Sequence, residues 1–137
     1  IKYPEPDFDY SQFAKNLEEG KRKTIQFIKE AIAKDKKIYG YGASTKGNTI
    51  LQYFDLGPGL ITAIADKSEE KWNKYTVGTM IPIVSEEEAH KAKPDYFLIL
   101  PWAFTDAFVK READWLRRGG KFIVPFPEFK IISSSGD

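Results

Sequence analysis

The feature that most constrains the fold is the continuous apolar run YFLIL at residues 96–100. A short run without polar interruption is typical of a strand that is buried on both faces of a parallel sheet. Shorter apolar runs at residues 38–41, 60–65 and 121–124 are separated by segments with helical character. Strands that alternate with helices predict an α/β fold, a Rossmann-like open, mostly parallel sheet with helices on both faces.

The expected helices have recognisable starts and ends. Ser11 is the expected cap of a first helix that ends near residue 34, with a weak point at Gly20. Further helices are expected over residues 46–54 and 105–118, and the capping box SEEE starts a small helix that continues to residue 91. Residues 67–78 have no hydrophobic period and predict a loop. A short apolar piece at 81–84 follows this loop, and residues 129–132 are a candidate last strand.

Length and charge restrict the class of protein. The 137 residues predict one domain, and 21 Lys and Arg against 20 Asp and Glu argue against a nucleic-acid or membrane partner. No apolar run approaches the roughly 20 residues of a membrane span, and the absence of cysteine excludes disulfides and thiolate metal sites. We expect a cytoplasmic protein.

The chain starts at Ile1 rather than at methionine. We therefore expect one domain of a longer polypeptide, in which residues 1–10 are a linker remnant stiffened by proline. Residues 11–132 are then the domain itself, and residues 133–137 are a frayed tail.

The sequence KIYGYGASTKGNTIL contains parts of two phosphate-binding motifs. Its first two glycines follow a strand as in the dinucleotide fingerprint, but the third glycine position holds Thr45. The spacing from Gly42 to Gly47 fits a P-loop, but Asn48 stands at the lysine position and Lys46 comes one residue earlier. Because the loop opens a helix whose amides favour an anion, we expect it to bind a phosphate or diphosphate. The alternative is that the glycines serve only packing and that the lysine lies in solvent.

Two further features are expected beside this loop. The turn PWAF follows the strand at 96–100, and ligands of such sheets lie at the carboxyl ends of the strands. Asp66 ends the second strand, where dinucleotide-binding folds keep a ribose-binding acid, although an aspartate that starts a turn is equally compatible. Trp102 can stack on a base or sugar, or close the sheet edge. The candidate substrate-binding residues are therefore Gly42, Ala43, Ser44, Thr45, Lys46, Gly47, Asn48, Asp66, Pro101 and Trp102.

Catalytic groups are harder to find. His90, the single histidine, lies in the charged segment EEEAHK and is expected at the surface. No Ser–His–Asp set, metal-ligand cluster or cysteine nucleophile can be assembled from the sequence. We expect the chain to bind a ligand rather than to transform it.

Five blocks of sequence occur in order: GYGASTKGNT at 40–49, T-x-GT-x-IPI at 76–83, PDY at 94–96, L-x-LPW at 98–102 and GGKFIVP at 119–125. Together they resemble the C-terminal domain of the S-adenosylmethionine-dependent C-methyltransferases that act on nucleotide-linked deoxysugars. The chain departs from this pattern at Ala103, where family members often have a polar residue. It also has Asn73 in place of a common glycine and Val77 in place of a common proline.

The resemblance implies an enzyme of three parts. A cysteine-rich zinc-binding portion precedes a Rossmann domain for S-adenosylmethionine, and a second Rossmann-like domain helps to bind the nucleotide-sugar. This chain looks like the last part, so S-adenosylmethionine and the catalytic base are expected in the upstream domain of the same polypeptide. No cofactor, metal or catalytic residue is then expected in this chain. Two alternatives remain open: a stand-alone Rossmann module that binds NAD or coenzyme A, and a structural domain that acts in assembly.

Overall fold

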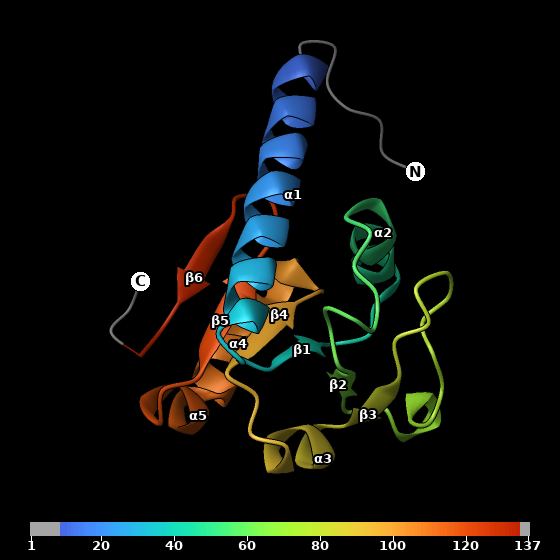
Figure 1. Cartoon of the computed structure of the whole chain (residues 1–137), viewed down its shortest axis with the longest axis vertical. Helices are drawn as coiled ribbons and strands as arrows, with labels where there is room; N and C mark the ends of the chain where they lie inside the picture. The colour runs from blue at the N-terminus through green and yellow to red at the C-terminus, as the bar shows by residue number, and fades with distance from the viewer. Residues whose placement is uncertain (1–8, 135–137) are drawn as a thin grey trace.

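A six-stranded sheet forms the centre of the protein, and the computed structural model describes residues 9–134 (Figure 1). The strand order is β3-β2-β1-β4-β5-β6, and the sheet is parallel except for the antiparallel pair β5 and β6. The strands are β1 (Ile38–Tyr41), β2 (Ile64–Asp66), β3 (Ile83–Ser85), β4 (Tyr96–Ile99), β5 (Lys121–Val124) and β6 (Lys130–Ile132). This order confirms the predicted α/β fold and places the reversal of strand order between β1 and β4.

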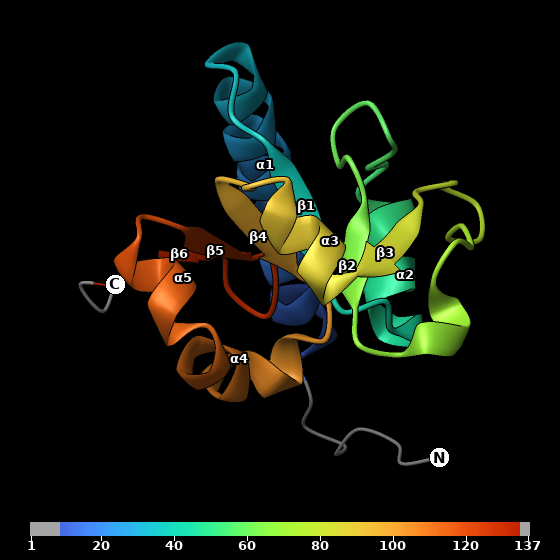
Figure 2. The ribbon, with the colours of Figure 1, turned by 90° about the horizontal axis from the view of Figure 1, so that it is seen from below.

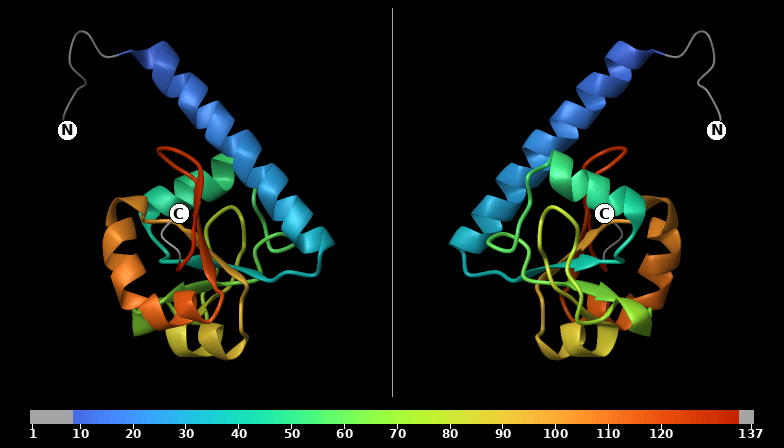
Figure 3. Two further views of the ribbon diagram at one scale, coloured as in Figure 1. Left: turned by 90° about the vertical axis from the view of Figure 1, so that its left-hand side faces the viewer. Right: turned by 90° about the vertical axis from the view of Figure 1, so that its right-hand side faces the viewer.

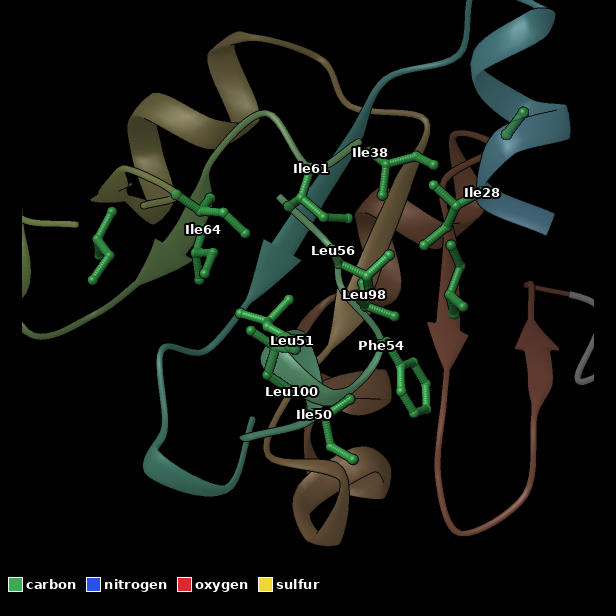
Figure 4. Packing of buried hydrophobic residues seen from close by; sticks show 14 residues of the cluster. Ile28, Ile38, Ile50, Leu51, Phe54, Leu56, Ile61, Ile64, Leu98 and Leu100 are labelled. Carbon is green, nitrogen blue, oxygen red and sulfur yellow. The ribbon is translucent and has the colours of Figure 1, made fainter. Parts of the chain in front are cut away.

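Helices cover both faces of the sheet (Figures 1 and 2). They are α1 (Tyr10–Ala33), α2 (Thr45–Tyr53), α3 (Glu86–Lys91), α4 (Thr105–Arg111) and α5 (Ala113–Arg117), with 3₁₀ turns η1 (Glu69–Lys71) and η2 (Trp102–Phe104). Successive strand residues point to opposite faces. Ile38 and Leu98 therefore join the core under α1 and α2, whereas Tyr39 and Phe97 join the core under α3 and α5. Figure 4 shows the first of these cores.

The first helix differs from its prediction at two points. Asp9, not Ser11, is the N-cap, because its carboxylate accepts a hydrogen bond of 3.0 Å from the amide of Gln12. The helix also runs unbroken through Gly20, which is buried and faces the carbonyl oxygen of Pro125. The first half of α1 extends beyond the sheet (Figure 3). Of the predicted linker at 1–10, residues 1–8 lie outside the described residues, as do the last three tail residues. The other two linker residues, Asp9 and Tyr10, form the start of α1 instead.

Other segments also depart from the sequence-based expectations. The second strand is shorter than predicted, because the amides of Leu60 and Ile61 bond to the carbonyl of Gly57 in a turn. The helix expected over 105–118 is divided into α4 and α5 at Glu112. A strand, β3, forms where only a short apolar piece was expected. The capping box is confirmed, since Ser85 Oγ accepts from the Glu88 amide at 3.0 Å. Within residues 9–134, no helix combines the length and apolar character needed to cross a membrane.

Candidate functional site

The loop after β1 lies directly against the loop after β4. Gly42 has a backbone φ of 86°, which favours glycine, and a Cβ atom on it would lie 2.8 Å from the ring of Pro101. The expectation that these two loops are neighbours at the carboxyl edge of the sheet is therefore confirmed. A larger side chain at Gly42 would push the two loops apart.

Gly47 lets α2 approach the end of β4. A Cβ atom at this position would lie 2.3 Å from Cβ of Leu100, far inside van der Waals contact. The amide of Gly47 donates to Ser44 Oγ at 3.0 Å, so Ser44 is the N-cap of α2. The packing role that the sequence left open for the glycines is therefore real, and Lys46 is exposed. Neither observation excludes an anion at this helix end.

Two backbone donors remain available at the start of α2. Three nearby amides are already engaged. The amide of Ala43 donates to the Asp66 carboxylate, the amide of Gly47 donates to Ser44 Oγ, and the amide of Asn48 donates to the Ser44 carbonyl. The first amides of a helix have no intrahelical acceptor. In the part of the chain that the structure describes, the backbone amides of Thr45 and Lys46 likewise have no acceptor. They lie at the positive end of the helix dipole, which favours negative charge.

Asp66 is buried and holds the loops on either side of it. Its Oδ2 accepts from the Ala43 amide at 2.7 Å, and its Oδ1 accepts from the Ser68 amide at 2.7 Å. The second bond is the turn-starting arrangement that the sequence left open as an alternative. These two bonds occupy one lone pair on each oxygen, so the ribose role stays a prediction.

Lys71 joins this cluster, and sequence reasoning missed it. Its Nζ donates to the carbonyl of Ala43 at 2.7 Å and lies 3.8 Å from Asp66 Oδ2. The adjacent indole of Trp72 donates to the backbone carbonyl of Asp66 at 2.7 Å, which fixes η1 beside the glycine loop. Nothing in the segment KSEEKW distinguishes this lysine from the other cations, because its partner is 28 residues away.

A hollow of about 580 Å³ opens between the start of α2 and the segment after η1, and we call it the α2 hollow. Its apolar floor comes from the core side of α2 and the sheet, and its rim is polar and aromatic. The lining residues are Ala43, Ser44, Thr45, Asn48, Leu51, Gln52, Ile64, Lys71, Tyr75, Thr76, Val77, Ile83 and Leu100. Of the ten predicted site residues, the structure brings four to this hollow: Ala43, Ser44, Thr45 and Asn48.

The other six predicted residues lie around the hollow without lining it. Gly42, Gly47 and Pro101 pack the loops together, Lys46 points from the exposed first turn, and Asp66 is engaged by amides. The ring of Trp102 is half-buried and lies edge-on to that of Phe126, with 5.2 Å between centroids. This packing matches the alternative in which the tryptophan closes the sheet edge.

Asn48 has unused hydrogen-bonding capacity. Its side-chain Oδ1 is buried, and it has no hydrogen-bond partner in the part of the chain that the structure describes. Buried polar atoms in proteins are nearly always paired. Since Asn48 also lines the α2 hollow, its amide can complete its hydrogen bonds with a polar ligand there. The opposite wall is steadied by Gln52, whose Nε2 donates to the Val77 carbonyl at 2.8 Å.

The opposite face of the sheet contains a second polar cluster, which corrects the expectation for His90. The histidine is not a solvated surface residue, because its Nε2 lies 3.0 Å from Glu112 Oε1 and its ring packs against Phe97. Tyr41 donates to Glu112 Oε2 at 2.6 Å and accepts from Arg111 Nη2 at 2.6 Å. We call Tyr41, Glu86, His90, Arg111 and Glu112 the Glu112 network.

Burial shifts the pKa values of this network. Desolvation, followed by the bond to Glu112, raises the pKa of Tyr41 far above its usual range, so the hydroxyl stays protonated. Desolvation also raises the pKa of Glu86, although the Arg111 guanidinium at 2.7 Å opposes this shift. A hydroxyl that stays protonated keeps donating this hydrogen bond to Glu112.

Two other features are weaker candidates for a site. A hollow of about 720 Å³ lies between α3 and α5, but it is next to Asp95 and Gly120, at the amino ends of β4 and β5. Ligands of open parallel sheets lie at the other edge. Between residues 9 and 134, no three His, Asp or Glu residues converge on a point that could hold a metal ion.

Comparison with known proteins identifies the family. The family model described as C-methyltransferase C-terminal domain matches residues 5–127. This chain belongs to that family. The C-methyltransferase NovU of Streptomyces niveus is 36% identical to it over 125 residues. That alignment covers 91% of the chain but 30% of NovU, so the chain spans less than a third of the length of this relative. The resemblance drawn from the five sequence blocks is confirmed at the level of the family.

Proposed function

We propose that this chain is the substrate-side domain of an S-adenosylmethionine-dependent C-methyltransferase that acts on a nucleotide-linked deoxysugar. In this proposal the α2 hollow holds the nucleotide-sugar while an upstream domain of the same polypeptide supplies the methyl donor and the base. The observation that carries the proposal is the meeting of Lys71, two free backbone amides and the unpartnered side-chain oxygen of Asn48 at one hollow of a C-methyltransferase C-terminal domain. NovU, a C-methyltransferase by name, supports the reaction class.

The chemistry of the hollow matches the parts of such a ligand. A diphosphate is an anion with many acceptor oxygens, which suit an ammonium group and the amides at a helix start. Sugar and base groups supply the donors that the side-chain oxygen of Asn48 lacks. Tyr75 stands on the rim with 59% of its surface exposed, and its ring offers a face on which a base can stack.

The methyl donor itself fits this hollow poorly. S-adenosylmethionine carries a sulfonium cation, and the hollow presents the ammonium of Lys71 together with the positive end of α2. The acid that would receive its ribose, Asp66, already accepts from two amides. We therefore assign no methyl-donor contact to this chain and derive no catalytic step from it.

A ligand panel tests the proposal against its alternatives. Thermal denaturation of the purified chain is measured with a nucleoside-diphosphate sugar, NAD, coenzyme A or S-adenosylmethionine. A ligand that binds only the folded state stabilises it by about 2.7 kcal/mol at 100 times its Kd. If the hollow binds the nucleoside-diphosphate sugar as proposed, this ligand should raise the Tm more than the other three do. Preference for NAD or coenzyme A would instead support the stand-alone module. No shift with any ligand would favour a structural domain.

Lys46 gives the first residue-level prediction. Its position in the first turn of α2 brings its flexible, exposed side chain within reach of an anion at the free amides. Loss of one charge-assisted contact costs about 1.5–3 kcal/mol, so Lys46→Ala should weaken nucleoside-diphosphate binding about ten- to a hundredfold. The measurement is isothermal titration calorimetry. The Tm without ligand should hardly change, and Lys46→Gln should lose nearly as much affinity as Lys46→Ala. Equal affinity of both variants and the unmodified chain would leave this lysine without a binding role.

A further inference from the structure

Lys71 supplies the positive charge in the lining of the α2 hollow. Of the described residues that line this hollow, it is the one with a positive charge, whereas Lys46 lies outside the lining. It comes from η1, and its Nζ contacts the carbonyl of Ala43 directly before the N-cap of α2. A ligand at the start of α2 would therefore meet the helix amides and this ammonium group together.

The contacts of Lys71 leave part of its ammonium group available. An ammonium group has three N–H donors. One is used by the Ala43 carbonyl at 2.7 Å, and Asp66 Oδ2 attracts a second from 3.8 Å. The side chain is 43% exposed, so the remaining donor has access to the hollow.

The same contacts fix the glycine loop from both sides. Asp66 accepts from the amide of Ala43 while Lys71 donates to the carbonyl of the same residue. The aspartate thus holds the loop directly and holds the ammonium group by charge. Partial burial weakens the screening of this charge by solvent, so it acts more strongly than a freely exposed lysine.

We propose that Lys71 is the charge contact for the phosphate groups of the ligand and that Asp66 positions its ammonium group. This inference rests on the proposed function, because it adds a specificity-determining residue to the same hollow. It predicts that the site prefers a nucleoside diphosphate to the uncharged nucleoside. The preference depends on Lys71 more than on Lys46.

The test uses calorimetric titration of the whole chain with uridine diphosphate, thymidine diphosphate, inorganic pyrophosphate and the two uncharged nucleosides. We expect Lys71→Gln to weaken diphosphate binding about a hundredfold and to leave nucleoside binding nearly unchanged, whereas the loss for Lys46→Gln should lie near the tenfold end of its expected range. The variant should also reduce the dependence of diphosphate affinity on salt, since one charge contact is lost. Lys71→Arg keeps the charge and should retain most of the affinity.

Lys74→Gln is the matched control. Lys74 is exposed, lies three residues further along the same segment and does not line the hollow, so the same loss of charge there should change affinity little. If the unmodified chain binds none of the three phosphate probes, the proposed function fails and this inference fails with it. If the unmodified chain binds them and Lys71→Gln binds equally well, the inference is wrong while the proposed function survives. Equal losses of affinity for the nucleosides and the diphosphates, together with a lower Tm, would show that Lys71 only stabilises the fold and would also overturn the inference.

Discussion

Gly47→Ala is expected to lower the free energy of unfolding by about 2 kcal/mol. The new methyl group would lie 2.3 Å from Cβ and 3.1 Å from Cα of Leu100, at the end of a central strand. Overpacking of this kind typically costs about 1–3 kcal/mol, and here neither neighbour is the flexible end of a side chain. The gain in helix propensity from replacing a glycine, about 1 kcal/mol, is too small to offset the clash. Urea denaturation followed by circular dichroism measures the difference.

Gly59→Ala is the control for this prediction. A Cβ atom on Gly59 has no neighbour within 4 Å, so the same chemical change should leave the stability within about 0.5 kcal/mol. Similar losses at both glycines would mean that backbone freedom matters and that packing on Leu100 does not. Because Gly47 also belongs to the binding loop, its variant should be tested for stability before any loss of affinity is interpreted.

Glu112→Ala is expected to destabilise the protein by about 1–3 kcal/mol. The carboxylate is buried, and its removal would leave the hydroxyl of Tyr41 and the ring of His90 without their shared acceptor. The guanidinium of Arg111 would lose a nearby counter-charge as well. Tyr41 is buried, and a buried donor that is left without an acceptor costs more than the hydrogen bond itself contributes. The change is again measured by urea denaturation.

The matched control is Glu87→Ala on the neighbouring helix. Glu87 forms an ion pair with Lys91 in which both side chains are at least three-quarters exposed, so its loss should be within error of the unmodified chain. Comparable stability of the Glu112 and Glu87 variants would show that the Glu112 network adds nothing to the fold. Nucleoside-diphosphate binding should survive Glu112→Ala wherever the variant remains folded, because the network lies on the other face of the sheet from the core under α2.

The elements predicted well from the sequence are those with a local physical signature. The apolar run of β4 and the capping box before α3 needed no knowledge of distant residues. By contrast, Glu112 divides α4 from α5 while bonding to Tyr41, 71 residues earlier in the chain. The surface expectation for His90 failed for the same reason, since its acidic partner Glu112 lies 22 residues further on, at the junction of α4 and α5.

In the candidate site, too, features with a local sequence signal were predicted and features that depend on distant contacts were not. The glycine loop was recognisable because strand, glycines and helix start are contiguous in the chain. Lys71 was not recognisable, because its importance arises from a contact with Ala43 across the fold. Sequence also could not decide between packing and binding for the glycines. The geometry at Gly47 establishes the packing role, and binding remains to be tested by titration.

The first half of α1 contacts the loops at the carboxyl edge of the sheet through aromatic rings. From Gly20, where the helix presses on the segment before β6, to Tyr10 the helix extends about 15 Å. Along this arm the ring of Phe13 meets that of Phe126 at 5.8 Å between centroids, and Phe126 meets Trp102 at 5.2 Å. The first turns of α1 are thus connected to the turn after β4 through three rings that contact one another edge to face. A displacement of the first turns of α1 would therefore disturb the same edge of the sheet where the ligand is proposed to bind.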